Sequence, residues 1–213
     1  MSQTIAANEI KLKDLKQSFG LQQVTEERFF PEWRATSEGG SGGWSSVEKM
    51  LLDRVKDNFL GLMNDPPILE STVKMFVLAP LMDMLGFYQK PFRTETKTST
   101  EIVAMDDDLV IRGRIDSLVL SDRLWVTVLE SKRSDFSVTR AIPQTLSYML
   151  ANSNTPTFGL ITNGTDFLFL KATRSFNSNS SNSNYENSRL FSLLNPGNEL
   201  YDVAHILKQI SLN

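Results

Sequence analysis

The spacing of apolar residues divides the chain into helical and extended segments. Residues 46–63, "SVEKMLLDRVKDNFLGLM", and residues 69–87, "LESTVKMFVLAPLMDMLGF", place their apolar side chains at helical spacing. We expect Ser46 to cap the first of these helices, Pro80 to kink the second and Gly86 to end it. The pattern therefore predicts two amphipathic helices ahead of the remaining elements.

From residue 92 onward the pattern changes to that of strands. "FRTETKTSTEIVA" alternates, "LVIRGRIDSLVL" and "LWVTVLES" predict a hairpin about Asp122, and "TFGLITNGTDFLFLKAT" predicts another that turns at Asn163-Gly164. Helical patterns lie between these hairpins, in "TRAIPQTLSYMLAN", and at the end, in "NPGNELYDVAHILKQISL". The order predicts an α/β fold with a central mixed β-sheet flanked by helices.

The chain is predicted to form a single domain with an appendage. Residues 1–36 read as a helical arm that docks through the aromatic residues of "FFPEW". Residues 37–45 form a flexible Gly/Ser linker whose "GGSGG" is natural or engineered, and residues 46–213 form the core. The Asn- and Ser-rich tract at 177–188, "NSNSSNSNYENS", predicts a mobile loop.

Composition narrows the possible functions. The 213 residues include no cysteine and one histidine, His205, which excludes disulfides, thiolate metal sites and multi-histidine zinc sites. No apolar run approaches the length of a membrane span and no signal peptide is apparent, so we expect a cytoplasmic protein. The net charge of -3 and pI of about 5.3 mean that any nucleic-acid contact needs a local basic patch or a bound cation.

Three charged residues interrupt the first predicted hairpin. Glu130 and Lys132 lie two apart on one strand and so share a face, and a turn near Arg123 would set Asp116 directly opposite Glu130. A one-residue slip would send Asp116 to the other face. Alternatively, the three residues form an ordinary solvated ion pair and a surface acid.

Two facing carboxylates repel each other unless a divalent cation lies between them. Mg²⁺, or Mn²⁺ in its place, binds one or two carboxylates, retains waters and then meets substrate phosphate. Asp116, Glu130 and the backbone carbonyl of Ser131 are the predicted ligands, and Lys132 would assist the attacking water or stabilise charge on phosphorus. These groups together could catalyse the metal-dependent hydrolysis of a phosphodiester.

An Asp at the end of one strand, then Glu-x-Lys on the next, then a helix, resembles the PD-(D/E)XK nuclease superfamily. Asp116, the "ESK" of residues 130–132 and the "QTLSY" of Gln144 to Tyr148 carry the resemblance, which spans residues 46–171. The last motif resembles QxxxY, typical of the branch that includes the nuclease domain of type I restriction enzyme R subunits. Ile115 stands where the superfamily usually has proline.

This resemblance implies a restriction-endonuclease-like core and a metal-dependent deoxyribonuclease, in a stand-alone cyanobacterial-type version. It implies an upstream helix acid, for which Glu70 is the candidate, and site roles for Gln144 and Tyr148. It also implies DNA as substrate and a helicase or another restriction subunit as a possible partner. The chain has no GxxxxGK[ST] motif and therefore encodes no motor of its own.

Arginines flank the predicted site and are candidate phosphate contacts: Arg112, Arg114, Arg133 and Arg140. Glu70 could equally be an acid favoured by a helix N-terminus, Gln144 and Tyr148 could belong to the helix surface and core, and the arginines could be solvated surface charges. Two other functions remain open. The fold could serve as a catalytically weak or inactive module that binds nucleic acid or a partner protein, or the protein could be purely structural.

Overall fold

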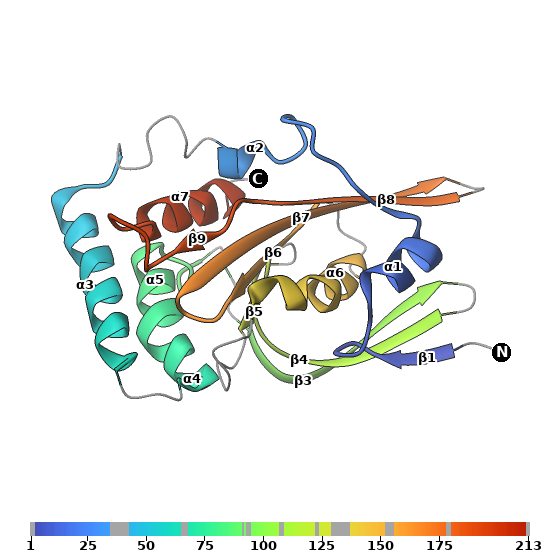
Figure 1. Cartoon of the computed structure of the whole chain (residues 1–213), viewed down its shortest axis with the longest axis horizontal. Coiled ribbons are helices and arrows are strands. Elements are labelled where there is room, and N and C mark those ends of the chain that lie inside the picture. The colour runs from blue at the N-terminus through green and yellow to red at the C-terminus, as the bar shows by residue number, and fades with distance from the viewer. Residues whose placement is uncertain are drawn as a thin grey trace.

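A computed structural model describes residues 3–34, 43–64, 68–90, 92, 95–106, 109–121, 124–128, 137–151, 156–177 and 180–211. For 3–4, 95–106, 109–110, 112–121, 124–128, 175–177 and 180–182 it describes the backbone alone. Within these residues the chain is α/β, with a mixed and mostly antiparallel sheet flanked by helices, as the sequence pattern predicts (Figure 1).

The described helices cover both faces of the sheet. They are α1 (Leu12–Phe19), α2 (Pro31–Arg34), α3 (Ser46–Leu62), α4 (Glu70–Val73), the π-helical turn η2 (Lys74–Leu78), α5 (Ala79–Met84), the 3-10 turn η3 (Val138–Ala141), α6 (Ile142–Ala151) and α7 (Leu200–Ser211).

The described strands form one nine-stranded sheet with the order β1-β4-β5-β6-β7-β8-β2, in which β3 pairs with β4 and β9 with β7. Their bounds are β1 Gln3–Ala6, β2 Leu21–Gln23, β3 Glu95–Asp106, β4 Leu109–Ser121, β5 Leu124–Val128, β6 Thr157–Thr162, β7 Asp166–Asn177, β8 Ser180–Asn187 and β9 Phe191–Ser192.

Strand β6 lies at the centre of the sheet and is buried along its whole length. Phe158 and Leu160 belong to one apolar cluster, with α3, α5 and α7, whereas Ile161 belongs to a second cluster with α1 and α6. Because successive side chains of a strand point to opposite faces, the sheet separates two cores. This explains why the middle of this strand, Phe158 to Ile161, does not alternate between apolar and polar residues.

The N-terminal arm contains strands as well as helices, which corrects the prediction of a helical arm for residues 1–36. Strand β1 pairs in parallel with β4, and β2 pairs in parallel with β8. The predicted aromatic docking is confirmed, since Phe30 is fully buried in the core cluster of α3 and α7. The arm therefore supplies two strands of the sheet as well as its aromatic anchor.

The predicted mobile loop at 177–188 is wrong over most of its length. Residues Ser180–Asn187 form β8, which pairs antiparallel with β7. Tyr185 is buried in the core, and the buried Glu186 forms an ion pair with Arg34 of α2. Backbone pairing and these two anchors outweigh the weak strand propensity of Asn and Ser.

The two helices that the sequence predicted first are present with small corrections. Ser45, rather than Ser46, caps α3: its hydroxyl accepts from the Glu48 amide at 3.3 Å and its own amide donates to the Glu48 carboxylate at 2.7 Å. The second helix accommodates Pro80 through η2, which precedes it. Positions 37–42 of the predicted linker lie outside the described residues, whereas Trp44 is anchored by a 3.2 Å hydrogen bond to the Tyr201 carbonyl.

Candidate functional site

The predicted hairpin of β4 and β5 is present, but its register differs from the predicted one. Ser117 pairs with Thr127 and Leu118 with Val126, so the pairing is shifted by two residues. Extending this register by one residue places Val128, not Glu130, across from Asp116. The shift arises because β5 begins at Leu124 and a register irregularity lies between Val119 and Ser121. Because the register is shifted by two residues, an even number, the shift does not move the position of Asp116 to the other face of the hairpin.

Most of the predicted metal site lies beyond the described part of the hairpin. Strand β5 ends at Val128, and Glu130, Ser131, Lys132 and Arg133 lie outside the described residues. Asp116 is described by its backbone alone, as are Arg112 and Arg114. Among the residues with described side chains, no three His, Cys, Asp or Glu residues gather as a metal site would require. The proposed ligand set therefore stays a prediction.

The helix that follows this segment brings the predicted Gln144 and Tyr148 together. The Gln144 Nε2 amide donates to the Tyr148 hydroxyl at 2.8 Å, across one turn of α6. The Tyr148 ring is buried in the cluster with α1, whereas Gln144 is only partly covered. Their pairing confirms that the two side chains share a helical face, as four-residue spacing implies.

Close packing against the sheet holds α6 in place. Helix α6 contacts β3, β5, β6 and β7, and every side chain from Thr145 to Leu150 is buried. At Gly159 of β6 an added Cβ would lie 2.9 Å from both the Met149 sulfur and the Thr145 methyl group. The absence of a side chain at Gly159 thus permits α6 to pack closely against β5 and β6.

Two further candidate residues, Glu70 and Arg140, have described side chains. Glu70 opens α4 and forms an ion pair with Lys74 one turn later. Arg140 lies exposed in η3, directly ahead of α6. The Glu70 contact agrees with the helix-start alternative, and a catalytic role for this acid stays a prediction.

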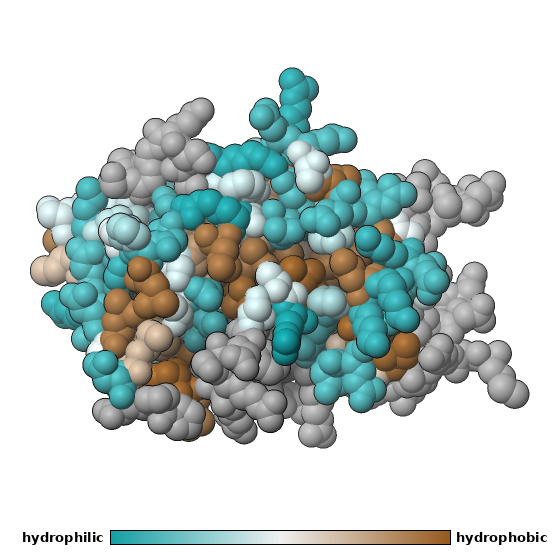
Figure 2. Space-filling view, in the orientation of Figure 1, coloured by the Kyte–Doolittle hydropathy of each residue, from teal (hydrophilic) through white to brown (hydrophobic). Residues whose placement is uncertain are grey.

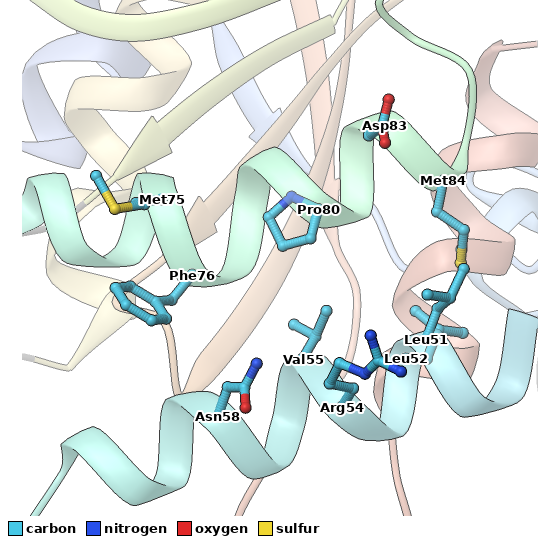
Figure 3. A pocket seen from close by; sticks show the side chains of 10 residues that line it. All are labelled: Leu51, Leu52, Arg54, Val55, Asn58, Met75, Phe76, Pro80, Asp83 and Met84. Atoms are coloured by element: carbon cyan, nitrogen blue, oxygen red, sulfur yellow. The ribbon is translucent and has the colours of Figure 1, made fainter.

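Sequence reasoning missed a groove between α3 and the helix formed by α4, η2 and α5 (Figure 3). It has a volume of about 270 Å³ and is lined by Leu51, Leu52, Arg54, Val55, Asn58, Met75, Phe76, Pro80, Asp83 and Met84. The available signal was in "SVEKMLLDRV", where Val47, Met50 and Leu51 are apolar at positions outside the buried face of α3.

Comparisons with known proteins give no family for this chain. No family model matches it, and no curated protein matches it significantly. None of the helices in the described part of the chain has the length and apolarity needed to cross a bilayer.

Proposed function

We propose that this protein is a Mg²⁺-dependent deoxyribonuclease with a restriction-endonuclease-like core. One observation supports this proposal above the others: β4, which contains Asp116, pairs with β5, which ends two residues before Glu130. The next described helix, α6, packs against β5 and presents the bonded pair Gln144 and Tyr148. The resemblance rests on the order of a strand acid, a Glu-x-Lys strand and a QxxxY helix, and of these the residues Glu130 to Lys132 lie outside the described part of the chain.

The donor chemistry fits a hard divalent cation. The carboxylates of Asp116 and Glu130 and the Ser131 carbonyl are all oxygen ligands, which Mg²⁺ and Mn²⁺ prefer. When bound, such an ion lowers the pKa of a coordinated water and polarises the phosphate. The pairing of β4 with β5 keeps the backbone of Asp116 near the strand that leads to the other two ligands.

Each side chain of the proposed site has its own role in the hydrolysis. Lys132 orients the attacking water and offsets negative charge on the phosphoryl oxygens. The attacking water gives up a proton to solvent as its oxygen forms a bond to phosphorus, the bond from phosphorus to the leaving oxygen breaks, and that oxygen takes up a proton from solvent. Gln144 and Tyr148 position the lysine, the phosphate or a base, while Arg114, Arg133 and Arg140 contact phosphates. Glu70 is the further acid of the proposed site.

The test is cleavage of DNA by the purified chain in Mg²⁺ or Mn²⁺. We expect Lys132→Ala and Asp116→Asn to abolish cleavage while circular dichroism and thermal unfolding remain those of a folded protein. Lys13→Ala, which removes an exposed lysine of α1, is the control and should cleave normally. Cleavage by Lys132→Ala at the rate of the unaltered chain would refute the assignment.

A second function is a catalytically inactive module that binds nucleic acid or a partner protein, such as a helicase or another restriction subunit. The net charge of -3 favours this function over the nuclease, and a partner protein over nucleic acid, because bulk charge does not draw this chain to DNA. Calorimetric titration with Mn²⁺ separates the two functions. Heat of binding that disappears in Asp116→Asn supports the nuclease, whereas absence of binding to the unaltered chain supports the module, which we expect to act in the cytoplasm.

A further inference from the structure

The groove between α3 and α5 continues into exposed apolar side chains on both of its walls. Val47 and Met50 of α3 are 61% and 51% exposed, and Met75 of η2 is 67% exposed. Val47, Met50 and Leu51 are spaced i, i+3 and i+4, so they form one stripe along the helix. In the space-filling view an apolar area lies over the part of the molecule where α3 and α5 run side by side (Figure 2).

This arrangement differs from scattered surface leucines. Single exposed apolar residues are normal, whereas a continuous apolar stripe beside a groove marks a surface that binds something. Leu52, Val55 and Phe59 already bury the inner face of α3 in the core. The apolar side chains of the stripe are therefore not needed to bury α3 against the core of this chain.

The groove also has one charge on each wall. Arg54 lies on α3 and Asp83 on the opposite helix (Figure 3). Neither forms a salt bridge within the described residues. The outer surface of α3 also has Lys49, Asp53 and Asp57, so that the rim of the groove has two basic and three acidic side chains in all. The surface is thus apolar at its centre and has charges of both signs at its rim.

The charge of this surface bears on the kind of partner that it can bind. A nucleic acid requires an excess of positive charge, which this surface lacks. A two-fold symmetric contact requires the same surface to complement itself, so that residue i of one copy meets residue j of the other and the reverse. A two-fold axis that passes between Arg54 and Asp83 would bring Arg54 of each copy against Asp83 of the second copy, and the apolar stripe of α3 against the wall of the second copy that contains Met75.

We propose that this groove and the apolar stripe beside it form the contact surface of a symmetric dimer of this chain. The apolar side chains supply the attraction, and the two reciprocal ion pairs set the orientation. The surface involves only α3, η2 and α5 and none of the residues assigned to phosphodiester hydrolysis.

Sedimentation velocity over a range of concentrations tests the proposal with the full chain. We expect a reversible dimer whose dissociation constant rises at least about tenfold in Met50→Glu and in Met75→Glu. Both side chains are exposed, so the monomer should keep its circular dichroism and unfolding midpoint. Lys13→Glu, on the distant helix α1, is the charge control and should dimerise normally.

Charge reversal tests the orientation. Arg54→Asp and Asp83→Arg should each weaken the dimer, and the double variant Arg54→Asp/Asp83→Arg should recover it, since the pairs then form with exchanged signs. A chain that stays monomeric at all concentrations overturns the proposal. A dimer whose dissociation constant is unchanged by Met50→Glu and Met75→Glu also overturns it. A dimer that the double charge reversal fails to restore overturns it as well.

Discussion

The Gln144 amide donates a hydrogen bond to the Tyr148 hydroxyl, with 2.8 Å between Nε2 and the phenol oxygen. Tyr148→Phe keeps the buried ring and removes the acceptor of this bond. We expect a loss of about 1 kcal/mol in the free energy of unfolding, the usual net contribution of one hydrogen bond. If the pair positions the proposed site, DNA cleavage falls by about tenfold or more, as for the loss of one positioning contact. Urea unfolding and cleavage rates measure the two effects.

Tyr185→Phe is the matched control for this variant. Tyr185 is also buried, and its hydroxyl donates to the Gln23 side chain at 3.2 Å, but it lies on β8 and not on α6. We expect a comparable loss of stability with unchanged cleavage. Equal cleavage rates in the two variants would remove Tyr148 from the proposed site.

Two ion pairs connect the short helix α2 to the sheet, and they predict a stability effect. The Lys171 ammonium lies 2.9 Å from a Glu32 oxygen, and the two side chains are only 11% and 9% exposed. Lys171→Met removes the cation that compensates a buried carboxylate. We expect a destabilisation of about 3–5 kcal/mol, as for one partner removed from a buried pair. Denaturant unfolding measures the change.

The double variant Glu32→Gln/Lys171→Met isolates the cause. It leaves no buried charge from this pair, so it should be more stable than Lys171→Met alone. If the double variant loses as much as the sum of the two single variants, the pair is not coupled and the explanation fails.

Local signals in the sequence predicted the central elements well. Asn163-Gly164 gave the turn between β6 and β7, because the Asn163 side chain accepts from the amides of Thr165 and Asp166 at 3.0 and 2.7 Å and Gly164 adopts a φ of +91°. Both requirements are local to the turn, so they can be read from neighbouring residues.

Elements that depend on distant partners could not be predicted in the same way. Strand β8 has the composition of a loop, yet it lies between β7 and β2, and Glu186 pairs with Arg34 far away in the sequence. The register of β4 with β5 likewise depends on an irregularity after Val119, which apolar alternation does not reveal. The candidate site was predicted as a local motif. Among its members with described side chains, which are Glu70, Arg140, Gln144 and Tyr148, the contact that the structure shows is the one between Gln144 and Tyr148.

Gly164 and Gly86 both have positive φ, but they differ in their surroundings. An added Cβ at Gly164 would lie 2.2 Å from the Phe59 ring, whereas one at Gly86 would meet nothing within 4 Å. We expect Gly86→Ala to cost about 1 kcal/mol from backbone strain alone. Gly164→Ala should cost a further 1–3 kcal/mol, roughly, from the forced displacement of Phe59. Thermal and urea unfolding of the two variants measure the difference, and equal losses would contradict the packing shown at Phe59.

Helix α7 is joined to α3 by a polar contact that depends on pH. The Tyr201 hydroxyl donates to the Asp53 carboxylate at 2.7 Å, and the Asn198 amide donates to the same oxygen at 2.9 Å. These bonds, that of Asn198 first, hold the pKa of Asp53 below its ordinary value. Burial and then the Asp53 contact raise the pKa of Tyr201 to about 12.

The sign of each effect follows from linkage. Because the pKa of Tyr201 is higher in the folded chain than its ordinary value near 10, its contribution is full below pH 10 or so and is lost as the pH rises toward about 12. Because the pKa of Asp53 is lowered, its contribution is full at neutral pH and is lost as the pH falls below about 4. Melting temperatures across both ranges should therefore fall at each extreme.

Tyr201→Phe separates this contact from the general loss of stability in alkali. The variant keeps the ring and lacks the titrating phenol, so its melting temperature should be lower at neutral pH and should fall less steeply than that of the unaltered chain between pH 10 and about 12. Lysine deprotonation affects both proteins alike and cancels in the comparison. Parallel curves for the two proteins would mean that the Tyr201 proton is not held by Asp53, and that α7 is joined to α3 by packing rather than by this hydrogen bond.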